Sequence, residues 1–440
     1  MNRAIARYGR GAIVLLAVLA AIAAWNVLRY PPGLGYDAGD HITYAEGILD
    51  GRGFPDGVGE YYTPPGFYGV AAGAIWVGRS LGLDQPLRVV QLVNAAFLLG
   101  AAVLLLELGR LIFPGRRVLH LAALGLFVCG VLAPKSAAMV HPETMSMFLC
   151  TLALVLAGRM IVRESWRVRD GAALGAALGA GQLVRAFSLW TFAVVLITLA
   201  AVLLMRPAQR RQIMVAGAFV LVFASLVAGP WYVYQSSRYT NPVFDRPQVQ
   251  KPLWKRRPVS FYLDPGLPDV LTSPTAPSFR NRFGPQLYAD SWGDYYGVLV
   301  WNNGQLAPDR GERRTLVVQM VLALVPTMLV AAGWIALLLR SLRPAARRRA
   351  PERLLVALLP LAGIAGMLYF AVSYPTPDGD VIKATYMLTT VPAWALCFGY
   401  AVDAVARRRP RLVPALIVVL ALAAVSGIRI ALFGTPLGVF

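Results

Sequence analysis

A group of polar side chains directly follows the first apolar run of the 440-residue chain. If the segment from residue 37 onward is helical, Asp37, His41 and Tyr44 are spaced i, i+4 and i+7 and share one face. Asp40 lies beside that face at i+3. A carboxylate that shares a face with a histidine and a tyrosine can act as a general base or bind a metal. The structural alternative is an aspartate that caps the N-terminus of a surface helix.

A short polar stretch between two later apolar runs holds Lys135, His141 and Glu143. The lysine could meet a lipid phosphate, because its ammonium group is a compact charge that suits phosphate. His141 or Glu143 could contact sugar hydroxyls. The alternative is that these residues only end helices near the membrane surface, since a glutamate also suits a helix N-terminus.

Two further places carry candidate binding residues. Arg185 lies near the end of an apolar run, where it is either a functional charge or an arginine whose head group reaches the interface. Trp292 and Asp294 belong to a stretch that mixes acids with aromatic residues, a composition typical of sugar binding. The alternative for that stretch is an aromatic belt at the membrane surface.

The composition excludes a soluble enzyme. Hydrophobic residues make up 57% of the chain and charged residues only 15%, and the mean hydropathy is +0.58. Several apolar runs reach the ~20 residues with which a helix crosses a bilayer. Their length without alternation excludes a β-barrel. The sequence therefore predicts an all-α polytopic membrane protein.

Eleven segments are predicted to span the membrane. They are 11–28, 86–109, 118–134, 143–160, 171–187, 189–205, 212–234, 315–339, 354–374, 386–406 and 412–433. The first segment lacks a small-residue cleavage site and is predicted to stay as an anchor. The three cysteines lie in apolar runs and predict neither a disulfide framework nor a zinc site.

The charge distribution decides the status of one further apolar stretch, 66–83. If this stretch lies along the outer surface as an interfacial helix, one side of the membrane receives 23 of the 42 basic residues but only five of the 22 acids. If it crosses, most of these arginines change sides and violate the positive-inside rule. We therefore predict a cytoplasmic N-terminus and a multi-pass protein of the cell membrane.

This topology divides the chain into three predicted regions. Residues 1–234 form a module of seven spans whose outer segment, 29–85, carries interfacial helices. Residues 235–314 form an extracytoplasmic region rich in proline and aromatic residues. Residues 315–440 form a C-terminal membrane module of four spans.

The segment 36–54 resembles the first outer loop of the GT-C glycosyltransferases, a superfamily that includes the protein O-mannosyltransferases and the aminoarabinose transferase of lipid A. Asp37, His41 and Ala45 keep the family spacing, as does the turn Gly51-Arg52-Gly53-Phe54. Ala38 stands where the family usually has a second acid, and Asp40 is a candidate replacement for it. The resemblance implies that Asp37 is the catalytic base.

Later segments carry the resemblance along most of the chain. Tyr62 precedes Pro64-Pro65, similar to the family's entry into a second juxtamembrane helix. Lys383 and Tyr386 begin the tenth predicted span, where the family has a basic residue and a Tyr-Leu-x-Pro-like run. The resemblance implies that Lys383 and Arg185, with Lys135 as a third candidate, bind the donor phosphate. Together with the residues above, the candidate substrate contacts are His41, Tyr44, Tyr62, His141, Glu143, Trp292, Asp294 and Tyr386.

The function that this resemblance implies is inverting transfer of a sugar from a polyprenyl-phosphate donor to a lipid, glycan or protein acceptor at the extracytoplasmic face. Such a donor requires no nucleotide-binding domain, and no nucleic-acid partner is expected. No cofactor is predicted, although a divalent cation stays open. The alternative function is a polytopic lipid transporter or flippase, which predicts internal repeats and polar residues at mid-membrane.

Overall fold

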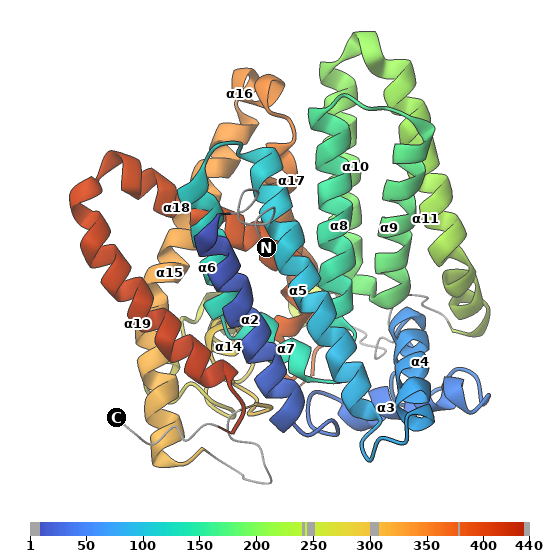
Figure 1. Cartoon of the computed structure of the whole chain (residues 1–440), viewed down its shortest axis with the longest axis vertical. Coiled ribbons are helices and arrows are strands. Elements are labelled where there is room, and N and C mark those ends of the chain that lie inside the picture. Colours follow the sequence, from blue (N-terminus) through green and yellow to red (C-terminus); the bar gives the residue numbers. More distant parts are fainter. Residues whose placement is uncertain (1–8, 240–242, 244–250, 300–307, 377–378, 435–440) are drawn as a thin grey trace.

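The computed structural model describes residues 9–239, 243, 251–299, 308–376 and 379–434, and each regular element within them is a helix. Long helices run side by side, and short helices lie at both ends of the bundle (Figure 1). The helices α3 and α4 lie at one end, and α16 lies at the other. The predicted all-α polytopic fold is confirmed.

Nine described helices, some extended by a short 3-10 turn, are long and apolar enough to cross a membrane. Their core helices are α2 (Arg10–Arg29), α5 (Leu87–Ile112), α8 (Glu143–Val162), α10 (Leu189–Met205), α11 (Arg210–Arg238), α15 (Arg310–Leu342), α17 (Arg353–Ser373), α18 (Val391–Arg408) and α19 (Val413–Ala431). The bent pair α6 (Arg117–Cys129) and α7 (Leu132–Ala138), at 47°, makes a tenth if it is one span. The remaining predicted span corresponds to α9 (Val168–Val184), which has 17 residues and falls at the lower limit for crossing.

The helix α9 packs against α11 through glycines. A Cβ atom built on Gly171, Gly175 or Gly179 would lie 2.4, 2.4 or 2.8 Å from a backbone oxygen of α11. This stripe recurs every four residues along α9, so it lets the two helix backbones approach closely along one face. The close contact fixes the end of α9, from which Arg185 projects.

Short elements complete one end of the bundle. The stretch 66–83 forms α4 (Gly66–Ser80), a 15-residue helix that packs on α3 (Ala38–Leu49), α5 and α9. The region 235–314 contributes η3 (Leu253–Lys255), α12 (Val259–Leu263), α13 (Asp269–Thr272) and α14 (Phe283–Trp292). The helix α14 contacts α7, α15 and η4 (Ala384–Thr390), the 3-10 segment that precedes α18.

The other connections are short. They are η1 (Ala186–Ser188), η2 (Pro207–Gln209), η5 (Pro410–Leu412) and α16 (Pro344–Arg349).

Candidate active site

Asp37 forms an ion pair with Lys383, which lies 346 residues away in the sequence. Lys383 Nζ lies 2.7 Å from Asp37 Oδ2, and the exposed fractions of the two side chains are 13% and 43%. Asp37 is the N-cap of α3 and has a φ of 52°, a left-handed conformation that aspartate tolerates better than most residues. The carboxylate is therefore accessible and is held against a cation at the start of η4.

The ring of Tyr386 brings a second cation to this ion pair. Lys383 Nζ lies 5.9 Å from the centre of the ring, and Arg185 Cζ lies 5.3 Å from it. Both distances are within the range of a cation–π contact. Asp37, Lys383, Tyr386 and Arg185, all predicted from the sequence, thus lie around one aromatic side chain.

Arg185 is fixed by acceptors from two other segments. Its Nε donates to Glu143 Oε1 at 2.6 Å, and its Nη1 donates to Thr63 Oγ1 at 2.8 Å and to Glu60 Oε2 at 3.4 Å. Thr63 in turn donates its hydroxyl proton to Glu60. Because Glu143 is fully buried and paired with Arg185, it positions the guanidinium group and is not exposed to a sugar.

Glu60 was missed by the sequence analysis. Burial alone would raise the pKa of its carboxyl, but the interactions with His41, Arg185 and the Thr63 hydroxyl outweigh burial and hold this pKa at about 2. Glu60 is thus an anion beside the candidate phosphate site. Its position directly before the Tyr-Tyr-Thr-Pro-Pro motif was the available signal, because that motif had already marked the segment as a family match.

His41 and Tyr44 lie on the buried face of α3, in an aromatic layer that also contains His141. His41 Nδ1 lies 2.7 Å from the Tyr68 hydroxyl, and the Tyr44 ring stacks on Tyr68 with the ring centres 3.8 Å apart. The His41 and His141 rings meet edge to face at 4.6 Å. Burial lowers the pKa of His41 to about 4 and that of His141 well below its usual value, so both rings are neutral at pH 7.

This layer joins α3 to α4 through Tyr68. Since His41, Tyr44 and His141 are each at most 2% exposed, the structure gives them packing roles rather than open sugar contacts. Two other candidates near α3, Tyr62 and Asp40, are less buried. Tyr62 packs against the rings of Tyr61 and Tyr239, and Asp40 is exposed on α3.

Lys135 lies in a fully buried ionic cluster. Its Nζ lies 2.7 Å from Asp290 Oδ1 and 3.8 Å from Asp294 Oδ1, and it also donates to the backbone oxygens of Asp290 and Gly293. Asp294 accepts in addition from two backbone amides of its own loop. An ammonium group has three N–H donors, and here they face acceptors of the protein itself. We therefore leave Lys135 and Asp294 out of the substrate site.

Asp290 joins three segments that surround the site. One carboxylate oxygen accepts from Tyr36 and Lys135, and the other accepts from the backbone N–H of Ala384, at 2.8, 2.7 and 2.7 Å. Tyr36 precedes Asp37, and Ala384 follows Lys383. The two partners of the ion pair are therefore held by the same carboxylate of α14.

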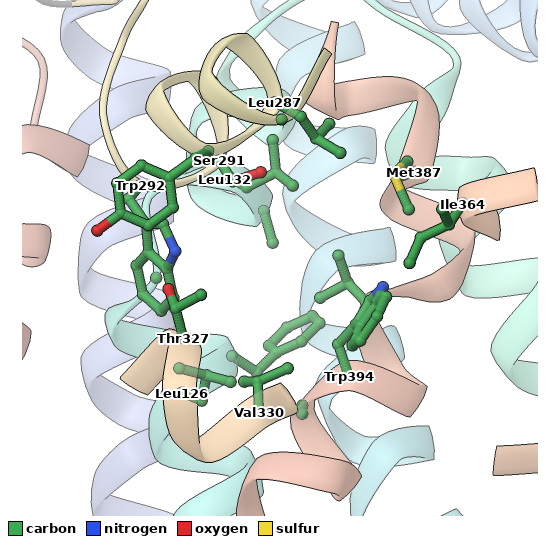
Figure 2. A pocket seen from close by; sticks show the side chains of 17 residues that line it. Leu126, Leu132, Leu287, Ser291, Trp292, Thr327, Val330, Ile364, Met387 and Trp394 are labelled. Carbon is green, nitrogen blue, oxygen red and sulfur yellow. The ribbon is translucent and has the colours of Figure 1, made fainter. Parts of the chain in front are cut away.

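Trp292 lines an apolar pocket of about 410 Å³ (Figure 2). Residues of α6, α7, α14, α15, α17, η4 and α18 form its wall. Figure 2 shows Trp292 and Met387 on opposite sides of the pocket, with Trp394 below Met387. Met387 directly follows Tyr386, so the pocket begins one residue from the ring that faces the two cations.

The described residues contain no group of three or more histidine, cysteine, aspartate or glutamate side chains that could hold a metal ion. Asp37 is already paired with Lys383. Asp378, which the sequence places two residues before Asp380 in an Asp-x-Asp pattern, lies outside the described residues. We assign no step to a metal ion.

No family model and no curated protein matches the sequence. Among solved structures, the chain is similar to the Archaeoglobus fulgidus oligosaccharyltransferase in complex with Zn and sulfate, with a TM-score of 0.56, 13% identity, and coverage of 96% of this chain and 53% of that one. For the oligosaccharyltransferase AglB from the same organism, in complex with an inhibitory peptide and a dolichol-phosphate, the values are 0.54, 11%, 98% and 57%. For ArnT from Cupriavidus metallidurans bound to undecaprenyl phosphate, they are 0.40, 16%, 91% and 80%.

The chain thus spans little more than half the length of the oligosaccharyltransferases that it matches, and at this identity the likeness concerns the fold. The alignment covers nearly all of this chain, from the first helices to the last. The order and arrangement of its helices are therefore those of the GT-C fold, as the resemblance in the first outer segment predicted.

Proposed function

We propose that the chain is a glycosyltransferase that takes a sugar from a polyprenyl-phosphate donor and transfers it to an acceptor hydroxyl at the extracytoplasmic face. The observation that carries this proposal is the accessible Asp37 carboxylate 2.7 Å from Lys383, with Arg185 on the same Tyr386 ring. A base beside a pair of cations is what transfer from a phosphate leaving group requires.

In the proposed reaction the acceptor oxygen attacks the anomeric carbon, and the bond between that carbon and the phosphate oxygen breaks. Asp37 takes the proton of the acceptor hydroxyl. Attack from the face opposite the phosphate inverts the anomeric configuration. The products are the glycosylated acceptor and polyprenyl phosphate.

Lys383 and Arg185 bind the leaving phosphate in this proposal. The ammonium of Lys383 has three donors, so it can keep Asp37 and still donate to a phosphate oxygen. Cations placed where negative charge develops are worth about 3 kcal/mol each in a water-poor site. Glu143 and Glu60 hold Arg185 in place for this contact.

The apolar pocket beside Met387 supports a lipid-linked donor. Its wall is almost wholly hydrophobic, and it includes Met387, which follows Tyr386 in the sequence. One structure of the similar fold, AglB, was solved with a dolichol-phosphate. The prenyl chain of a lipid-linked donor would occupy the pocket shown in Figure 2.

A transfer assay tests the proposal. Membranes that contain the full chain are incubated with a panel of undecaprenyl-phosphate-linked donors, each carrying a radiolabelled hexose, and the label transferred to acceptors is measured. Asp37→Asn keeps an oxygen that can accept from Lys383 but removes the base, so we expect transfer to fall by roughly 10²–10⁴-fold. Binding of undecaprenyl phosphate should stay within a few-fold. The control Glu46→Gln, on the same helix and paired with Arg79, should retain transfer.

Full transfer by Asp37→Asn would contradict the role of this base. If the wild-type chain moved no label from any donor of the panel but carried undecaprenyl phosphate across the bilayer of a vesicle, the alternative function of a flippase would replace this proposal.

A further inference from the structure

A second cavity, of about 1050 Å³, lies at the far end of the bundle from Asp37. It is a half-open cavity lined by the C-terminal halves of α15 and α18, by α16 and by the start of α17. In Figure 1, α16 stands at one end of the bundle and α3, which begins after Asp37, lies at the other. The cavity is therefore separate from the candidate active site.

Arginines from five segments converge on this cavity. Arg340 and Arg343 end α15, Arg349 ends α16, and Arg353 begins α17. Arg407 and Arg408 end α18, and Arg116 joins them from the connection between α5 and α6.

The positive charge of the cavity is largely uncompensated. In the described part of the chain, a single carboxylate, Asp403, forms ion pairs with these arginines, and it pairs with Arg116 and Arg407. The Nε atoms of Arg116 and Arg353 are buried and have no hydrogen-bond partner within the described residues. Buried donors without acceptors are costly, so these two guanidinium groups are suited to bind a ligand with several acceptor oxygens.

The deeper part of the cavity is apolar. Small and aliphatic residues of α15, including Leu329, Ala332 and Ala336, face Ala404 and Val405 of α18 across it. At Gly333 the two helices touch, because an added Cβ would lie 2.0 Å from the backbone oxygen of Cys397. Facing alanines leave space next to this contact. The arginines thus lie at the helix ends, and the apolar wall extends from them along candidate spans.

A cationic rim above an apolar wall matches a phospholipid. The positive-inside rule alone would account for arginines that are scattered over exposed loops. It does not account for seven that face one cavity from separate segments. We propose that this cavity binds the phosphate headgroup of an anionic membrane lipid, with an acyl chain against α15 and α18.

The full chain in mixed nanodiscs of phosphatidylcholine with phosphatidylglycerol or cardiolipin tests this proposal. The anionic lipids retained after detergent extraction are measured by native mass spectrometry. The variant Arg340→Gln/Arg343→Gln/Arg349→Gln should lose retention on the order of a hundredfold, since each arginine near a lipid phosphate contributes roughly a fivefold change. The control Arg163→Gln/Arg167→Gln/Arg211→Gln removes three exposed arginines outside the cavity and should retain the lipid.

A second variant changes no charge. Ala336→Phe fills the apolar wall and should reduce retention at least tenfold while the rim stays intact. Equal retention by the wild-type and both cavity variants, or an equal loss in the control, would overturn the site. If glycerophosphate at millimolar concentration displaced the lipid as well as added phosphatidylglycerol did, the site would be one for soluble phosphate and the lipid assignment would fail.

Discussion

Arg185 donates hydrogen bonds to the carboxylates of Glu143 and Glu60 and to the hydroxyl of Thr63. None of these acceptors belongs to the segment that carries Arg185. Glu143 is fully buried, so water cannot replace it as the hydrogen-bond acceptor of Arg185. Glu60 is nearer to the open side, where it partly neutralises Arg185 and Lys383. The net charge offered to a phosphate therefore depends on Glu60.

Glu60→Gln should strengthen the binding of undecaprenyl phosphate about fivefold, because it removes one partly exposed anion worth about 1 kcal/mol. Turnover should slow if release of that product limits the rate. Isothermal titration calorimetry with the detergent-solubilised chain measures the affinity for undecaprenyl phosphate. Glu46→Gln, which breaks an exposed pair with Arg79, is the control and should leave binding unchanged. Weaker binding by Glu60→Gln would contradict this role of Glu60.

The two buried histidines of the aromatic layer, His41 on α3 and His141, should make the protein sensitive to acid. Their pKa values are lowered by burial, to about 4 for His41, whereas an unfolded histidine titrates near 6.5. Between these values the unfolded state binds more protons than the folded state. Stability is therefore complete above about pH 6.5 and falls as the pH drops toward 4, by up to about 3 kcal/mol for His41.

The melting temperature of the purified chain between pH 7.5 and 4.5 measures this effect. His41→Gln/His141→Gln should flatten the curve below pH 6.5, because glutamine does not titrate. The same slope in the double variant and the wild type would show that other groups cause the loss.

At the scale of elements, the close contact of α9 with α11 fixes the position of Arg185. Gly175→Leu should separate the two helices, since even a Cβ would lie 2.4 Å from the Val220 oxygen. We expect a loss of about 3 kcal/mol or more, in the range of severe overpacking. Gly217→Leu is the matched control, because a Cβ built on Gly217 meets nothing within 4 Å. Thermal denaturation followed by fluorescence-detected gel filtration compares the two, and equal melting temperatures would exclude a packing role for Gly175.

The helices were largely predictable because a helix that crosses a bilayer needs about 20 consecutive apolar residues. Each of the eleven apolar segments corresponds to a described helix or bent pair, and charge counting kept 66–83 out of the spans, as the 15-residue α4 supports. The family resemblance also identified Asp37, Lys383 and Arg185 as candidates for one site. Their spacing in the sequence alone does not show that they lie close together. Local sequence did not reveal that Lys135 is buried against Asp290, because its acceptors lie 155 residues away. For the same reason Glu60 was overlooked, since its partner Arg185 comes from another helix end.

At the scale of the whole molecule, the topology predicted from charge has a direct test. In a Cys129→Ala background, Ser260→Cys on α12 and Ala345→Cys on α16 place single exposed thiols near opposite ends of the bundle. A membrane-impermeant maleimide should label Ser260→Cys in intact cells and Ala345→Cys only after permeabilisation, because the arginine-rich end is predicted to be cytoplasmic. The reverse pattern would place Asp37 on the cytoplasmic side and end the proposed extracytoplasmic transfer.

The carboxylate of Asp290 holds the backbone beside Lys383 with one oxygen and the ring beside Asp37 with the other. The region that carries α14 therefore helps to set the distance between Asp37 and Lys383. A foreign loop grafted at this place would have to supply the same carboxylate, or Asp37 and Lys383 would lose their shared anchor even if the long helices folded.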